Sequence, residues 1–225
     1  LKLFFASGSI SYGNTWRNLL NSQLITPGNT NVDINTTAVA DRNIAQNASI
    51  SGNVSKDIRP IATSISLNAS YGLSSGQHIR QGVKAEIQGN SLSFTPTIIS
   101  TISKKLELNY RMSYTRNMQS SVSFSNVYHN QSHRLNLSYN PLKTLIVYSS
   151  FEFARFELAQ NEFKNTLFLD GGVRYKYKKA ELELKLNNLL NSKSYSYSVV
   201  NDLDRYTYTY YLNPREIVCI CKFNL

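Results

Sequence analysis

Apolar and polar side chains alternate along most of this 225-residue chain. The clearest run covers residues 180–187, where Ala180, Leu182, Leu184 and Leu186 alternate with Glu181, Glu183, Lys185 and Asn187. A period of two places every apolar side chain on one face of a β-strand and every polar side chain on the other. No segment has apolar residues at a convincing helical spacing. The pattern therefore predicts an all-β protein.

The same alternation predicts about ten antiparallel strands. They cover residues 1–13, 44–56, 61–73, 83–94, 106–115, 135–139, 145–153, 167–177, 180–187 and 217–225. In the fourth strand the apolar phase changes near Gly89 and Asn90, which predicts a β-bulge. The whole of residues 1–225 is expected to be one domain.

The predicted connections alternate between long and short. Long polar loops are expected at residues 14–41, 75–78, 117–130 and around 160–162, and tight turns at 57–60, 103–105, 140–143 and 178–179. Tight turns at one end of consecutive hairpins are typical of an up-and-down transmembrane β-barrel. A soluble sandwich with Greek-key crossings has no reason to place all its tight turns at one end. The fold class that we expect is therefore an antiparallel outer-membrane barrel.

Composition agrees with that expectation. The chain is 41% hydrophobic with a mean hydropathy of −0.31, and it has no run of 18 apolar residues that would make a transmembrane helix. Barrel strands average to a modest hydropathy because they alternate. The formal charge of +10 is dispersed along the chain, without a basic helix or a nucleic-acid-binding module. We expect no nucleic-acid partner.

The polar face is rich in Ser, Asn and Thr and carries both charges, which suits a water-filled lumen. Seven charged residues are expected to face this lumen and to form a cross-strand ladder rather than contact substrate directly. These are Glu107, Arg111, Asp170, Arg174, Glu181, Glu183 and Lys185.

Tyrosines gather toward the strand ends and predict an aromatic girdle at the membrane interfaces. The alternative is that Tyr is simply a good strand former. The residues concerned are Tyr110, Tyr114, Tyr175, Tyr177, Tyr195, Tyr197, Tyr206, Tyr208 and Tyr210.

No catalytic, metal or cofactor motif is present, and we expect the protein not to be an enzyme. His129 and His133 lie four apart without a third ligand nearby and are interpreted as loop residues at the outer rim. A surface calcium site built from Asp202, Asp204 and Glu216 is the weaker alternative to ordinary surface carboxylates. The two cysteines of the closing strand lie too far apart for a disulfide and are interpreted as small apolar residues.

Residues 188–191 read Asn-Leu-Leu-Asn after an outgoing strand. A Tyr-rich segment follows, and then Leu-Asn-Pro-Arg-Glu at 212–216 precedes a closing strand. This arrangement resembles the C-terminal end of Bacteroidetes-type TonB-dependent outer-membrane receptors. The lipid-facing residues of the closing strand are expected to be Ile217, Cys219, Cys221, Phe223 and Leu225.

The resemblance implies a barrel of 22 strands filled by an N-terminal plug in the cell outer membrane. It also implies energised uptake of large nutrients such as glycans, siderophores or peptides. Its partners would be outer-membrane lipid, a TonB-type energy-coupling protein, the plug and strands upstream, and in some cases a surface lipoprotein. Because the chain starts at Leu1 within an expected strand, we expect a fragment or a processed product.

Two alternatives stay open. One is a self-contained ten-strand barrel, either a small pore or an enzyme with its site at the outer rim. The other is a soluble β-domain that acts in adhesion or binding.

Overall fold

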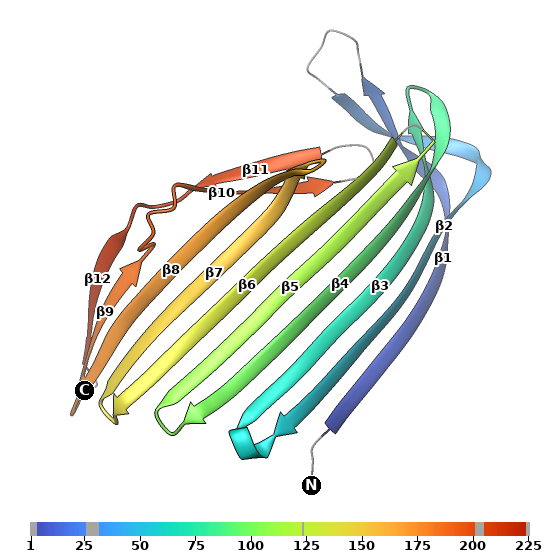
Figure 1. Ribbon diagram of the computed structural model, residues 1–225. Helices are drawn as coiled ribbons and strands as arrows, with labels where there is room; N and C mark the ends of the chain where they lie inside the picture. Colours follow the sequence, from blue (N-terminus) through green and yellow to red (C-terminus); the bar gives the residue numbers. More distant parts are fainter. Residues whose placement is uncertain (1–3, 26–31, 123, 201–204, 224–225) are drawn as a thin grey trace.

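The computed structural model describes residues 4–25, 32–122, 124–200 and 205–223 (Figure 1). These residues form twelve strands and one short 3₁₀ helix. In chain order they are β1 Phe4–Ile25, β2 Val32–Ile58, η1 Arg59–Ile61, β3 Thr63–Arg80, β4 Val83–Ser103, β5 Leu106–Ser121, β6 Phe124–Leu142, β7 Leu145–Ala159, β8 Glu162–Tyr177, β9 Ala180–Asn187, β10 Ser194–Val200, β11 Arg205–Tyr211 and β12 Glu216–Phe223. No helix in these ranges is long and apolar enough to cross a membrane.

Ten of the strands form one antiparallel sheet in the order β1-β2-β3-β4-β5-β6-β7-β8-β9-β12. Figure 1 shows this sheet as a single curved layer, with β1 at one edge and β12 at the other. Strands that follow one another in the chain are neighbours in the sheet, with one exception. β10 and β11, which come between β9 and β12 in the chain, form a separate two-stranded sheet, and β9 pairs directly with β12. The predicted all-β class and the succession of antiparallel hairpins are confirmed.

The pairing register aligns the apolar residues of each strand with the apolar residues of its neighbours, and the polar residues with the polar ones, so the sheet has two continuous faces. Directly opposed residues on antiparallel strands point to the same side of the sheet, so Leu108 shares a face with Leu137, and Arg174 shares the other face with Glu183. We call the first the apolar face and the second the polar face.

The apolar face is largely uncovered. Only four hydrophobic side chains are buried among the described residues, namely Leu20, Ile87, Tyr128 and Ala154. Large residues of the apolar face stay exposed from the β2–β3 pair to the edge strand, among them Leu67, Leu73, Leu137, Val173, Leu184, Ile217 and Phe223. The sheet therefore has no second layer over this face within the described part of the chain.

Three of the predicted long loops are wrong over their described residues, while the connection predicted around 160–162 is present as a turn; residues 26–31 lie outside the described residues. Residues 14–25 belong to β1 and 32–41 to β2, residues 75–78 lie inside β3, and residues 117–121 and 124–130 belong to β5 and β6. Two turns at this end, both fully described, are as tight as those at the other, because Gln81–Gly82 joins β3 to β4 and Gln160–Asn161 joins β7 to β8. Alternation identifies a strand in a sequence only where one face of the strand is apolar and the other is polar. A strand that carries Ser, Asn and Thr on both faces can still be hydrogen-bonded to its neighbours, but its sequence shows no alternation.

The β-bulge predicted near Gly89 and Asn90 is also wrong. Both residues keep continuous register with β3 and with β5. The apolar residues change face instead: Ile87 lies on the polar face with Gly89, and Leu92 lies on the apolar face. Ile87 lies near the end of the sheet opposite the four predicted tight turns. Its side chain is buried there, so it is shielded from water although it lies on the polar face.

Candidate functional site

All seven charged residues that the sequence singled out lie on the polar face, as the registers of β5 through β9 require. The structure brings only some of them together. Arg174 is the centre of this group, and its guanidinium Nη2 lies 3.0 Å from Oε1 of Glu183 and its Nε 3.5 Å from Oε1 of Glu181. Lys222 of β12 approaches the same oxygen of Glu181 at 3.7 Å.

Glu183 is the buried member of this cluster, with only 3% of its side chain exposed. Its Oε1 also accepts a hydrogen bond from the Tyr148 hydroxyl at 2.7 Å. The Tyr148 ring lies directly over Gly172 of the neighbouring strand, a position that any larger residue would block. A buried carboxylate needs such donors, because an unpaired charge is very costly to bury.

The other predicted charges do not join this cluster. Asp170 accepts a hydrogen bond from the backbone N–H of Asn188 at 2.7 Å. Glu107, Arg111 and Lys185 form no ion pair with any described residue. The ladder that the sequence predicted is thus limited to the strands nearest the C-terminal edge.

The Asn-Leu-Leu-Asn segment turns the chain from β9 into the β10–β11 hairpin. Asn188 and Asn191 both have left-handed backbone conformations, with φ of 51° and 54°, which Asn tolerates better than most residues. The Asn188 side chain donates to the carbonyls of Ser192 and Asn213 and accepts from the N–H of Ser192. Asn188 therefore forms hydrogen bonds with the segments on both sides of the β10–β11 hairpin.

The β10–β11 hairpin packs on the polar face of the sheet. The Tyr195 ring lies 5.4 Å from that of Phe156 and 6.1 Å from that of Phe168, both polar-face residues of β7 and β8. Ser198 donates to the carbonyl of Leu158, and Ala154 beneath the hairpin is 1% exposed. Burial raises the pKa of the Tyr195 phenol above its ordinary value, and a nearby carboxylate, Glu152, adds to the shift.

This packing corrects part of the predicted girdle. Five of the tyrosines belong to the hairpin on the polar side and not to the edge of the apolar face: Tyr195, Tyr197, Tyr206, Tyr208 and Tyr210. Tyr197 stacks on Tyr208 and Tyr210 across the hairpin. Tyr110, Tyr114, Tyr175 and Tyr177 do lie on the apolar face.

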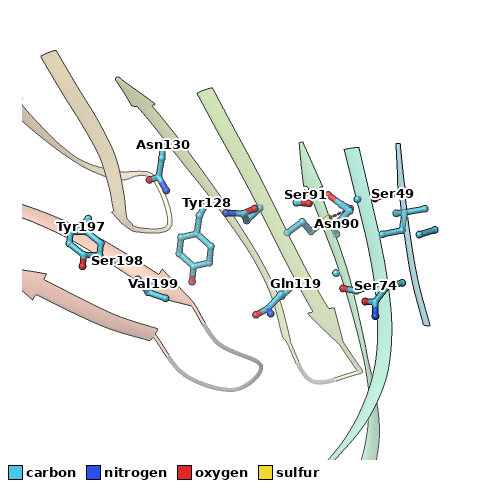
Figure 2. Close-up of a pocket in the computed structure, with 17 residues that line it drawn as sticks. Ser49, Ser74, Asn90, Ser91, Gln119, Tyr128, Asn130, Tyr197, Ser198 and Val199 are labelled. Atoms are coloured by element: carbon cyan, nitrogen blue, oxygen red, sulfur yellow. Dashed lines mark hydrogen bonds between the residues drawn. The ribbon is translucent and has the colours of Figure 1, made fainter. Parts of the chain in front are cut away.

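A cavity of about 640 Å³ lies between the hairpin and the polar face of β2 through β6. Figure 2 shows Tyr128 and Asn130 of β6 on one side, Tyr197 to Val199 of β10 below them, and Ser74 and Gln119 across the gap. The full lining is Asn47, Ala48, Ser49, Gly72, Leu73, Ser74, Gly89, Asn90, Ser91, Asn117, Met118, Gln119, Tyr128, Asn130, Tyr197, Ser198 and Val199.

No charged residue contributes to this lining. Amides and hydroxyls dominate it, with two tyrosine rings. Oε1 of Gln119 and Oδ1 of Asn130 are buried and accept no hydrogen bond from the described residues. Buried acceptors normally have partners, and neither oxygen is reached from the cavity by a water-sized molecule, so each side chain would have to turn before its oxygen could accept a hydrogen bond from a ligand. The arrangement can bind a neutral, hydroxyl-rich molecule.

Sequence reasoning missed this cavity because it assigned residues 117–130 to a loop. Alternation gave no usable signal there, because polar side chains stand at both odd and even positions, as at Arg116, Asn117, Gln119 and Ser120.

The closing strand lies as the sequence predicted. Ile217, Cys219, Cys221 and Phe223 pair opposite the apolar row of β9, and both cysteines are free and exposed. Leu225 lies outside the described residues, as do Asp202 and Asp204.

The interpretation of His129 and His133 as loop residues is wrong. Both lie inside β6 on the apolar face, where their Nδ1 atoms are hydrogen-bonded to the hydroxyls of Tyr114 and Tyr110 at 2.9 and 2.7 Å. Within the described ranges no three metal-ligating side chains come together.

Compared with family models, with curated proteins and with solved structures, the chain gives no significant match.

Proposed function

We propose that this chain forms part of the wall of an outer-membrane β-barrel, the C-terminal half of a TonB-dependent transporter for large nutrients. The observation that supports this proposal best is the uncovered apolar face. A folded soluble monomer of 25.5 kDa would expose about 10,000 Å², whereas this chain exposes 15149 Å². Because the described residues form no second layer over the apolar face, we infer that this face contacts lipid or another molecule.

The dimensions of the apolar face fit a bilayer. Its row on β5 runs from Leu106 to Tyr114, which is about 27 Å along the strand at about 3.4 Å per residue. With a barrel-like tilt of about 40°, this row spans about 21 Å, close to the apolar band of outer-membrane barrels. Beyond Tyr114 the strand continues to Ser121, and we assign this polar extension to the outside of the cell.

In hydrocarbon, the edges of the sheet must be paired, because each unsatisfied backbone group there costs several kcal/mol. β1 and β12 are the two edges of the sheet. The transporter proposal requires that each of them pairs with a further strand of a larger barrel around a plug. Oxidative cross-linking of native Cys221 to cysteines introduced along residues 6–12 tests this requirement. Cross-linking within one chain would instead indicate a self-contained ten-strand barrel.

The membrane placement has a direct test. Single cysteines at positions 108–111, in a Cys219→Ala/Cys221→Ala background, are exposed in liposomes to a membrane-impermeant maleimide. We expect reaction at 109 and 111 and protection at 108 and 110, because only the polar face meets water. Equal reaction at all four positions would refute the membrane placement and favour a soluble domain.

Within the proposed class, the cavity favours a neutral glycan over a charged siderophore or peptide. Its lining is uncharged, and amide groups with aromatic rings bind sugar hydroxyls and C–H faces well. Gln119→Ala/Asn130→Ala should weaken binding of neutral oligosaccharides, with maltoheptaose as a first probe, by about threefold to tenfold per lost hydrogen bond. Asn109→Ala, on the same face outside the cavity, is the matched control. Binding of a ferric siderophore or a tripeptide, but of no oligosaccharide, would exclude the glycan assignment.

A further inference from the structure

The apolar face ends in a cationic cluster on β5, β6 and β7. Arg116 lies directly opposite His129, and Gln131 lies directly opposite Arg155, one step along the same face. We call these four residues the arginine patch. The row below it is Met112, His133, Phe153 and Leu167, which belongs to the uncovered apolar surface.

The two guanidinium groups of the patch keep donors that no described residue uses. Arg116 donates one hydrogen bond from Nη1 to Oδ1 of Asn90 at 3.2 Å. Arg155 stacks over the Phe163 ring, with Cζ 4.1 Å from its centre. Neither forms an ion pair with a described carboxylate. Such planar groups bind phosphate through paired N–H donors.

The one carboxylate on this part of the face is occupied. Glu157 is 3% exposed, and its oxygens accept the backbone N–H groups of His129 and Asn161 at 2.9 and 2.8 Å. It therefore stabilises the β6–β7 and β7–β8 backbone rather than neutralising the arginines.

We infer that the arginine patch binds the phosphate headgroup of a lipid whose acyl chains lie on the apolar face beneath it. The patch and the apolar row are adjacent on the same surface, so one amphipathic molecule can contact both. Between the two arginines, His129 is hydrogen-bonded to the Tyr114 hydroxyl and Gln131 to His133, so the guanidinium groups supply the donors for the phosphate.

This inference rests on the proposed membrane placement, and its test separates the two. Full-length protein in dodecyl maltoside is titrated with dioleoyl phosphatidic acid, dioleoylglycerol and inorganic phosphate, and bound molecules are counted by native mass spectrometry. We expect phosphatidic acid to bind at least about tenfold more tightly than either of the others, because only it presents both a phosphate and acyl chains. This comparison uses the unaltered protein and does not depend on the folding of a variant.

The variant Arg116→Gln/Arg155→Gln should lose about tenfold or more in affinity for phosphatidic acid. Arg111→Gln removes the same charge from the opposite face of β5 and should bind the lipid as the unaltered protein does. Equal binding of dioleoylglycerol, equal binding of inorganic phosphate, or unchanged binding by the double variant would each overturn the inference. If the cysteines at positions 108–111 still alternate in reactivity, the membrane placement survives that result.

Discussion

Replacing Gly172 with alanine tests the packing of the polar face at its most constrained point. A Cβ atom at this position would lie 2.5 Å from Cζ and Oη of Tyr148 and 2.7 Å from the carbonyl oxygen of Leu184. The carbonyl belongs to a paired strand and has little freedom, so the Tyr148 ring must move. Moving it breaks the hydrogen bond from its hydroxyl to Glu183.

The expected loss has two parts. Steric overpacking costs about 1–3 kcal/mol, and a hydrogen bond to a buried carboxylate contributes about 1.5–3 kcal/mol. Together they predict a loss of about 3–5 kcal/mol in the free energy of unfolding for Gly172→Ala. Tyr148→Phe, which removes only the hydroxyl, should show the second part alone.

Equilibrium urea unfolding in phosphatidylcholine bilayers measures these differences. Gly13→Ala is the matched control, because a Cβ at that strand glycine meets nothing within 4 Å. In a Tyr148→Ala background the effect of Gly172→Ala should shrink to the strain against the Leu184 carbonyl. If Gly172→Ala and Gly13→Ala unfold alike, the ring does not occupy the space over Gly172 and this reasoning is wrong.

Three further tests probe the remaining features. Glu183→Gln should lower stability by about 1–3 kcal/mol, whereas Glu152→Gln, whose ion-pair partner is 56% exposed, should cost under about 1 kcal/mol; urea unfolding compares the two. Asn188→Ala should free the β10–β11 hairpin and make it sensitive to limited proteolysis, and unchanged protection would show that the Tyr195 packing suffices. Leu108→Lys, on the apolar face, should destabilise the protein in bilayers by about 2–4 kcal/mol, whereas Asn109→Lys should not; equal effects would contradict the assignment of the two faces.

The sequence by itself determined the strands that carry the apolar face. Where one side of a strand is apolar and the other polar, as at residues 106–115 and 180–187, the period of two leaves no doubt about conformation or facing. It also determined that Ile217, Cys219, Cys221 and Phe223 share one face of the closing strand, whereas the pairing of that strand with β9 came from the structure. Tight turns at Lys104–Lys105 and Lys178–Lys179 lie where the alternation stops.

Only the tertiary structure decided what happens beyond the apolar rows. Residues 117–130 are polar on both sides, and nothing local tells a hydrated strand from a hydrated loop; the ladder between β5 and β6 settles the question through partners distant in sequence. The tyrosines of β10 and β11 suit a membrane interface as well as a hairpin packed on the polar face, and the contacts of Tyr195 with Phe156 and Phe168 select the second. The cavity depends on both outcomes, because its walls come from segments far apart in the chain that no local pattern relates.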